Sequence, residues 1–258
     1  MGIRVFFVAL FLSLIAACGG SPESVAEQAT ATEAAVEEAT AQSLNEPAVD
    51  TAPAVAEKPA AAAGSAPRTW KYRQGAHYQQ FANAQGTSSS PDKIEVAEVF
   101  WYGCPHCFSF EPYLEKWKPT LGSDVSFVRI PVMWNPTNEI HARLFYTIQA
   151  LGIQDEAHGA IFSELHTNRK MLASEGAQRD FITSNFDVSE EDFDKAYRSF
   201  SVNGKLQQAK TFTQRYQVRS VPLLIINGKY ATTGDEVRSL DEVLEIADEL
   251  IERERQSL

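Results

Sequence analysis

Two cysteines in a C-x-x-C spacing carry the clearest chemistry in this sequence. Cys104 and Cys107 enclose Pro105 and His106, and the third cysteine, Cys18, lies far away in the sequence. Two cysteines three residues apart can form a small reversible disulfide. The loop that this disulfide would close is too short to stabilise the fold much through chain entropy. The spacing therefore predicts redox chemistry rather than a structural cross-link.

The position of the pair at the start of a predicted helix should make one thiol unusually acidic. Pro105 suits the first turn of a helix, and apolar residues follow at helical spacing to about Lys118. Free N–H groups and the helix dipole favour an anion at this end, so we expect Cys104 to have a lowered pKa. His106 can add a hydrogen bond or a positive charge. Cys107 lies one turn deeper, and we expect it to be the buried, resolving partner.

Stabilising the thiolate also indicates the direction of the reaction. Whatever favours the thiolate favours the reduced form, so the disulfide becomes a strong oxidant that is donated to other proteins. A reductase or isomerase, or a metal-binding adaptor, would use the same pair. A structural zinc site needs four ligands, however, and the sequence has no second C-x-x-C, while His158 and His166 have a poor ligand spacing. We predict no metal, and no cofactor besides the redox-active disulfide Cys104–Cys107.

The elements around the pair predict an α/β fold. A strand over 93–100 leads into the cysteines, and a second strand over 125–132 follows their helix, which indicates a parallel β–α–β unit. Helical patterns fill most of the chain from Glu139 to Tyr216. The C-terminal part is predicted to contain strands over 221–226 and 229–232, a tight turn at Asn227-Gly228, and a helix over 239–253 that begins with the capping pattern Ser239-Leu240-Asp241-Glu242.

The first 68 residues differ in composition from the rest. Residues 1–17, with Arg4, an apolar run and then small residues, are typical of an export signal peptide. The segment that ends at Cys18 resembles a bacterial lipobox, although Ile15 stands where Leu is usual; an ordinary cleaved signal is the alternative. Residues 18–68 lack aromatic residues and are rich in Ala, Glu and Pro. We interpret them as a lipidated cysteine followed by a disordered tether.

Only residues 69–258 can bury a large core, because they hold all four Trp and all eight Tyr residues. The formal net charge of the whole chain is −11. Nucleic acids bind basic surfaces, so an acidic chain is a poor match for them, and we expect no nucleic-acid partner.

Two motifs resemble the DsbA family of periplasmic disulfide oxidases. The first runs from Glu98 to Phe108 (EVFWYGCPHCF) and is followed by Phe110-Glu111-Pro112; the second is Ser220-Val221-Pro222, followed by NGKY. The resemblance covers roughly residues 75–250. It implies a thioredoxin fold (βαβ…ββα) over 69–258 with an inserted helical domain at about 138–215.

The resemblance also assigns roles to single residues. Cys104 would be the nucleophile and Cys107 its resolver, while Pro105 and His106 would tune the reduction potential. Pro222 would be a cis-proline facing the disulfide, and the backbone of Val221 would pair with an extended substrate segment.

Glu98 would be buried beneath the cysteines and assist proton movement. Strand alternation places it on one face with Val96 and Phe100, which favours burial over the alternative of an exposed edge carboxylate or a salt bridge. Arg129 is a candidate partner, and an Arg129 that faces water is the alternative.

The family resemblance further implies a location and partners. The substrates would be exported proteins with free thiols, and a membrane oxidase of the DsbB type would restore the disulfide. We expect a monomer in the periplasm that reaches the membrane through a lipid on Cys18. The long tether and the lipid are departures from the usual family pattern.

Overall fold

A mixed five-stranded sheet lies at the centre of residues 69–257, which are the residues described by the computed structural model. The predicted signal peptide, Cys18 and the tether lie outside the described residues. The strands, in spatial order, are β1 (Gln79–Gln80), β5 (Tyr230–Ala231), β4 (Leu223–Ile226), β2 (Ile94–Phe100) and β3 (Val125–Pro131). β2 is parallel to β3, and the other neighbours are antiparallel.

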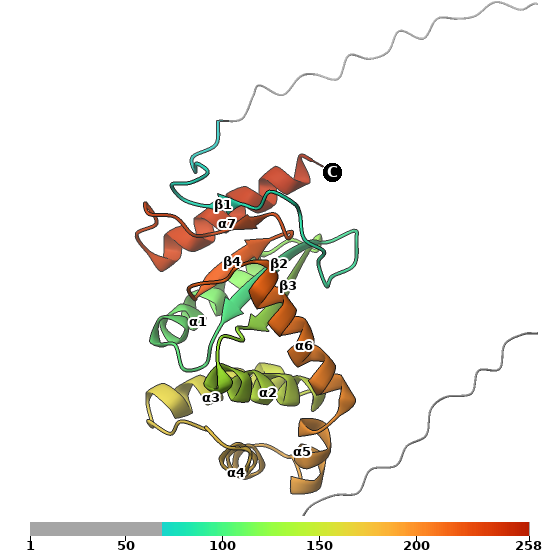
Figure 1. Ribbon diagram of the computed structural model, residues 1–258. Coiled ribbons are helices and arrows are strands. Elements are labelled where there is room, and N and C mark those ends of the chain that lie inside the picture. Colours follow the sequence, from blue (N-terminus) through green and yellow to red (C-terminus); the bar gives the residue numbers. More distant parts are fainter. Residues whose placement is uncertain (1–68, 258) are drawn as a thin grey trace, which may run out of the picture. The chain divides into compact units, whose positions relative to one another are not determined.

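Two helices cover one face of this sheet. Helix α1 (Pro105–Trp117) connects β2 to β3 through the short 3-10 helix η1 (Lys118–Thr120), and α7 (Leu240–Arg255) follows β5. Leu114 of α1 and Leu250 of α7 share a buried apolar cluster with Val96 of β2. Figure 1 shows α1 and α7 beside the strands. The β2–α1–β3 and β4–β5–α7 halves form the thioredoxin fold, as the sequence predicted.

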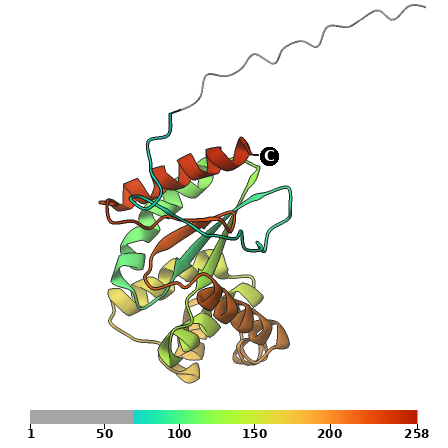
Figure 2. The same cartoon turned by 45° about the horizontal axis from the view of Figure 1, so that its top comes forward.

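Five helices lie between β3 and β4 in the chain; the first four lie at one end of the sheet, and the last runs back alongside its strands (Figures 1 and 2). They are α2 (Pro136–Ala150), α3 (Gln154–His166), α4 (Glu175–Asn185), α5 (Glu190–Tyr197) and α6 (Phe200–Arg215). Their fully buried side chains, such as Phe145 and Phe162, belong to the same apolar cluster as Cys104 and Cys107. The helical block therefore shares one buried apolar core with the cysteine pair.

Polar side chains fix where several of these helices begin. Asn135, Ser174, Ser189 and Ser199 each accept a backbone N–H bond at the start of α2, α4, α5 and α6. Ser239 does the same for α7, as its capping pattern predicted, by accepting from the N–H of Glu242.

The structure corrects the predicted strands in three places. The strand expected over 221–226 begins only at Leu223, because Pro222 has no N–H for the ladder, and the strand expected over 229–232 is limited to Tyr230–Ala231. β1 was not predicted, since two glutamines give no alternating pattern. Within residues 69–257, no helix is long and apolar enough to cross a membrane.

Candidate active site

The cysteine pair lies at the junction of β2 and α1. Cys104 has extended backbone angles and is the N-cap of α1, with Pro105 in the first turn. The backbone N–H of Cys107 donates to Cys104 Sγ at 3.4 Å. Both cysteines are free thiols; Cys104 is 7% exposed and Cys107 is 0% exposed. The pair therefore consists of one slightly exposed cysteine and one fully buried cysteine, in the predicted order.

The two thiols differ in proton affinity. The hydrogen bond with the Cys107 thiol, helped by the backbone N–H groups of Cys107 and His106 and by the charge of His106, lowers the pKa of Cys104 to about 6. Partial burial of Cys104 opposes this change. Burial raises the pKa of Cys107 far above its ordinary value, and its hydrogen bond with Cys104 adds to the effect. At neutral pH Cys104 is thus ionised and Cys107 protonated.

The second sequence motif meets the first at Cys104. The Val221–Pro222 peptide bond is cis, as predicted, and the Val221 carbonyl oxygen lies 3.7 Å from Cys104 Sγ. Val221 and Pro222 are both half-buried. A backbone carbonyl from the loop before β4 therefore lies beside the accessible sulfur.

A buried ionic cluster joins β2, β3 and α1, the elements that surround the cysteine pair in the chain. Glu98 on β2 is opposite Arg129 on β3, and Arg129 Nε donates to Glu98 Oε2 at 2.8 Å. The same guanidinium donates to Glu111 Oε2 and to Glu115 Oε1, both at 3.1 Å. Glu98, Glu111 and Arg129 are all buried. The predicted pairing of Glu98 with Arg129 is confirmed, and Glu111 joins it from α1.

The pKa values of the two buried carboxyls, Glu98 and Glu111, are shifted in opposite directions. Burial raises the pKa of Glu98 above its ordinary value, the charge of Glu111 adds to this, and Arg129 offsets only part of it. Burial acts the same way on Glu111, but the hydrogen bond with His158 and the charge of Arg129 outweigh it and hold that pKa below its ordinary value.

Glu98, Glu111 and His158 bring their ligand atoms within 4.8 Å of one another. Arg129 already donates to both carboxylates, which supplies the positive charge that a cation would bring. These side chains are better suited to holding a proton than a metal ion.

Three histidines of the helical block hold the segment that leads into Cys104. Trp101 Nε1 donates to His141 Nδ1 at 3.0 Å. The Tyr102 hydroxyl lies 2.8 Å from His158 Nδ1, and the Tyr102 carbonyl accepts from His166 Nε2 at 2.8 Å. The sequence interpretation missed these contacts. The eight-residue spacing of His158 and His166 puts both on one face of α3, which is unsuited to a shared metal but suited to two contacts with Tyr102.

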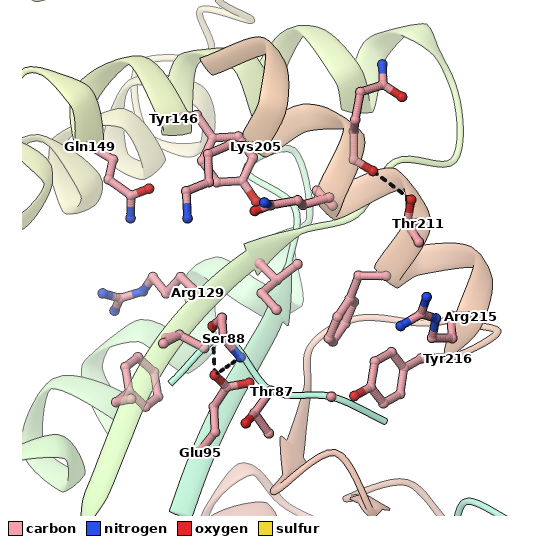
Figure 3. Close-up of a pocket in the computed structure, with 18 of the residues that line it drawn as sticks. Thr87, Ser88, Glu95, Arg129, Tyr146, Gln149, Lys205, Thr211, Arg215 and Tyr216 are labelled. Atoms are coloured by element: carbon pink, nitrogen blue, oxygen red, sulfur yellow. Dashed lines mark hydrogen bonds between the residues drawn. The ribbon is translucent and has the colours of Figure 1, made fainter. Parts of the chain in front are cut away.

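Two cavities border the ionic cluster. One, of about 630 Å³, lies between β3, α2, α6 and the loop 86–88; Figure 3 shows Arg129, Tyr146 and Lys205 around it. On its floor, the Glu95 carboxylate accepts from the backbone and hydroxyl of Ser88 (Figure 3). The other, of about 780 Å³, is a cleft between α1 and α3. Neither is lined by the cysteines, so the cysteine chemistry takes place on a different surface.

In the reduced pair the ionised thiol can attack a disulfide of another protein, and in the oxidised pair the disulfide can be attacked by the thiolate of another protein, one sulfur at a time. On a thioredoxin fold, this chemistry defines the chain as a thiol–disulfide oxidoreductase.

Comparisons with known proteins narrow this class. Thiol:disulfide interchange protein DsbA of Pseudomonas aeruginosa PAO1 is 37% identical over 192 residues, which cover 74% of this chain and 90% of that protein. The DsbA of Pseudomonas syringae pv. tomato is 41% identical over 165 residues, covering 64% and 77%. The crystal structure of Pseudomonas aeruginosa DsbA matches with a TM-score of 0.68 and 37% identity, covering 72% of this chain and 96% of that one. No protein-family profile matches the chain.

These similarities show that the chain belongs to the DsbA family of thiol:disulfide interchange proteins. It is accordingly a protein disulfide oxidoreductase, and the family resemblance drawn from its two motifs is confirmed.

Proposed function

We propose that the protein introduces disulfides into exported proteins by donating its own Cys104–Cys107 disulfide. The observation that carries this proposal is the pairing of an acidic Cys104 thiol, of pKa about 6, with a buried Cys107 thiol. A stabilised thiolate lowers the free energy of the reduced form, so the oxidised form gives up its disulfide readily. The same stability makes Cys104 a good leaving group.

The reaction takes place in two exchanges. A substrate thiolate attacks Cys104 Sγ, the bond between the two cysteines breaks, and Cys107 leaves as a thiolate that takes up a proton. A second substrate thiolate then attacks the mixed disulfide and displaces Cys104 as a thiolate. The substrate is oxidised by two electrons, the cysteine pair is reduced by two, and the redox-active disulfide is the only redox group required.

The neighbouring residues support these steps. Glu98 is buried on the strand that leads into the pair and its charge acts on Cys107; its raised proton affinity suits it to exchange a proton with that thiol. Pro105 and His106 adjust the stability of the Cys104 thiolate. The Val221 carbonyl oxygen lies 3.7 Å from Cys104 Sγ, and in this proposal the backbone of Val221, followed by Pro222, would pair with an extended substrate segment by strand addition.

The N-terminal sequence supports a location outside the cytoplasm. In this proposal, residues 1–17 are a signal peptide, Cys18 carries a lipid, and 18–68 tether the domain 69–258, with its helical insertion at about 138–215, to a membrane on the periplasmic side. A membrane oxidase of the DsbB type would reoxidise the cysteines. The protein would act as a monomer and would bind no nucleic acid.

Disulfide transfer to a peptide tests this function. The full chain carrying Cys18→Ser has only Cys104 and Cys107 as thiols; we expect its oxidised form to convert a reduced two-cysteine peptide to the disulfide in a 1:1 ratio, measured by mass spectrometry at pH 7. A peptide with one cysteine is the control and should yield only a mixed disulfide. If the oxidised protein leaves the two-cysteine peptide reduced while the reduced protein opens a peptide disulfide, the chain is a reductase instead.

A further inference from the structure

His158 connects the active-site segment to the buried ionic cluster. It lies on α3 and is 3% exposed. Its Nδ1 is 2.8 Å from the Tyr102 hydroxyl, and its Nε2 is 3.2 Å from Glu111 Oε1. The rings of Phe100 and Phe162 pack around the imidazole at centroid distances of 5.2 Å. Both ring nitrogens are thus used, and the aromatic rings fix the orientation of the imidazole.

The partners of His158 determine its tautomer. Burial raises the pKa of the Tyr102 hydroxyl well above its ordinary value, so Tyr102 keeps its proton and can donate it to Nδ1. Nε2 then carries the hydrogen of the neutral imidazole and donates it to Glu111. Glu111 is a suitable acceptor because Arg129 stabilises its carboxylate from the other side. A hydrogen bond donated to the ionised form favours that form.

The cluster holds more negative charge than Arg129 can neutralise. Glu98 and Glu111 are both buried beside one guanidinium, while Glu115, which also contacts it, is largely exposed. Leaving an uncompensated charge buried is costly, so the two carboxyls retain one proton between them at neutral pH.

The hydrogen bonds show which carboxyl holds this proton. Both oxygens of Glu111 are engaged, Oε1 by His158 and Oε2 by Arg129. Glu98 Oε2 is engaged by Arg129, whereas Glu98 Oε1 is buried without a hydrogen-bond partner among the described residues. The carboxylate oxygen that is free to carry the shared proton is therefore Glu98 Oε1, on the carboxyl whose pKa is raised.

We propose that His158 is a positioning residue that keeps Glu111 ionised and thereby assigns the shared proton to Glu98. This inference rests on the proposed function, in which Glu98 exchanges a proton with Cys107. Without the His158 hydrogen bond, the proton would be divided between two carboxyls, and Glu98 would be a less effective partner for the buried thiol.

His158 acts in this arrangement as a neutral hydrogen-bond donor. The charged groups around it are Glu111 and Lys118 from α1 and η1, Arg129 from β3, Glu98 from β2, and the titratable Tyr102 after β2. Asp155 and Glu156, on its own helix, lie at the rim of the cleft. Burial lowers the pKa of His158, and the charges of Arg129 and Lys118 act in the same direction; the hydrogen bond with Glu111 and the charge of Glu111 oppose this change without outweighing it. The imidazole therefore stays uncharged at neutral pH.

The cleft between α1 and α3 gives the cluster contact with solvent. It is lined by Glu111, Arg129 and His158. Glu111 can therefore exchange a proton with water in this cleft, which the cysteines do not line.

Carboxyl titrations of the oxidised protein test the proposal. We would follow ¹³C-labelled glutamate carboxyls by NMR against pH in the full chain, with the two signals assigned by Glu98→Gln and Glu111→Gln. In the wild type, the Glu98 carbon should titrate above the ordinary carboxyl range while Glu111 stays ionised. In His158→Phe, the titration of Glu111 should move upward by about one pH unit or more, because it loses a hydrogen bond to its ionised form.

Three further variants sharpen this test. His158→Gln keeps an N–H that can reach Glu111 and should restore most of the wild-type titration. Tyr102→Phe removes only the hydroxyl that fixes the tautomer, so it should shift Glu111 in the same direction by less, and it serves if His158→Phe does not fold. His141 is a second buried histidine, and its ring nitrogens bond to Trp101 and to the Met171 carbonyl rather than to a carboxylate of the described residues. His141→Phe should therefore leave both titrations unchanged.

An unchanged Glu111 titration in both His158→Phe and Tyr102→Phe would overturn the proposal, as would a wild type in which Glu111 and not Glu98 holds the proton. These titrations need no substrate. Their failure is therefore distinguishable from a failure of disulfide transfer to the peptide.

Discussion

Replacing Cys104 by serine is expected to abolish disulfide transfer, whereas replacing Cys107 by serine is expected to trap substrates on Cys104. Cys104 is the accessible, ionised sulfur, and no other described residue can take its place. Without Cys107, an activated mixed disulfide forms normally but lacks the internal thiol that would resolve it. In chains that also carry Cys18→Ser, non-reducing electrophoresis with a one-cysteine peptide offered as an activated disulfide would show a persistent adduct for Cys107→Ser and none for Cys104→Ser.

Ser109→Ala is a suitable control for this pair of variants. Ser109 is exposed on α1, and its hydroxyl bonds only to the backbone carbonyl of Pro105. The Ser109→Ala variant should therefore exchange disulfides like the wild type. A persistent adduct on Cys104→Ser, or rapid release from Cys107→Ser, would reverse the roles assigned to the two sulfurs.

Replacing Arg129 by leucine is expected to destabilise the fold by about 3–5 kcal/mol at neutral pH, since it leaves buried carboxylates without their counter-charge. Arg129 is the hydrogen-bond donor shared by Glu98 and Glu111, and its own side chain is only 4% exposed. Urea unfolding of the oxidised protein would measure the loss. Arg255→Leu, which removes an exposed ion pair with Asp124, is the control and should cost about 1 kcal/mol or less.

The stability that Arg129→Leu loses relative to the wild type should become smaller as the pH falls. The pKa of Glu98 in the folded wild type already lies above the unfolded value of about 4.5. Without Arg129, both carboxyls bind protons more tightly in the folded state than in the unfolded chain. The folded variant therefore gains stability relative to the wild type as the pH falls through this raised range, and the difference should shrink towards pH 4.5. A loss that stays constant from pH 8 to pH 4.5 would show that packing, not charge, is responsible.

The local chemistry was predictable from the sequence because it depends on neighbours in the chain. The cap at Cys104, Pro105 in the first turn and the deeper Cys107 all follow from the start of one helix. The burial of Glu98 was predicted correctly but for an incomplete reason. All of β2 is buried, including Glu95 on the opposite face, because this central strand is covered on both sides. Alternation alone would have left Glu95 exposed.

The parts that depend on tertiary packing were not predictable in this way. Glu111 follows Cys107 by four residues, so its place on the same side of α1 was available from helix periodicity. The contact of Glu111 with His158 required knowing that α3 of the helical block packs beside α1. The short strand β1 is likewise specified by its partner β5 rather than by its own sequence.

The reduction potential of the Cys104–Cys107 couple as a function of pH tests the central claim most directly. Lowering the pKa of Cys104 from 9.0 to about 6 favours the reduced form by about 1.4 kcal/mol at pH 7, which raises the potential by about 30 mV. Equilibration of the full chain carrying Cys18→Ser with glutathione buffers should give a value above that of thioredoxin, about −270 mV. The slope should change near pH 6 from about 59 to about 30 mV per pH unit, because Cys104 no longer takes up a proton on reduction. A potential at or below that of thioredoxin, with the steeper slope continuing past pH 8, would contradict the assignment of the chain as a disulfide donor.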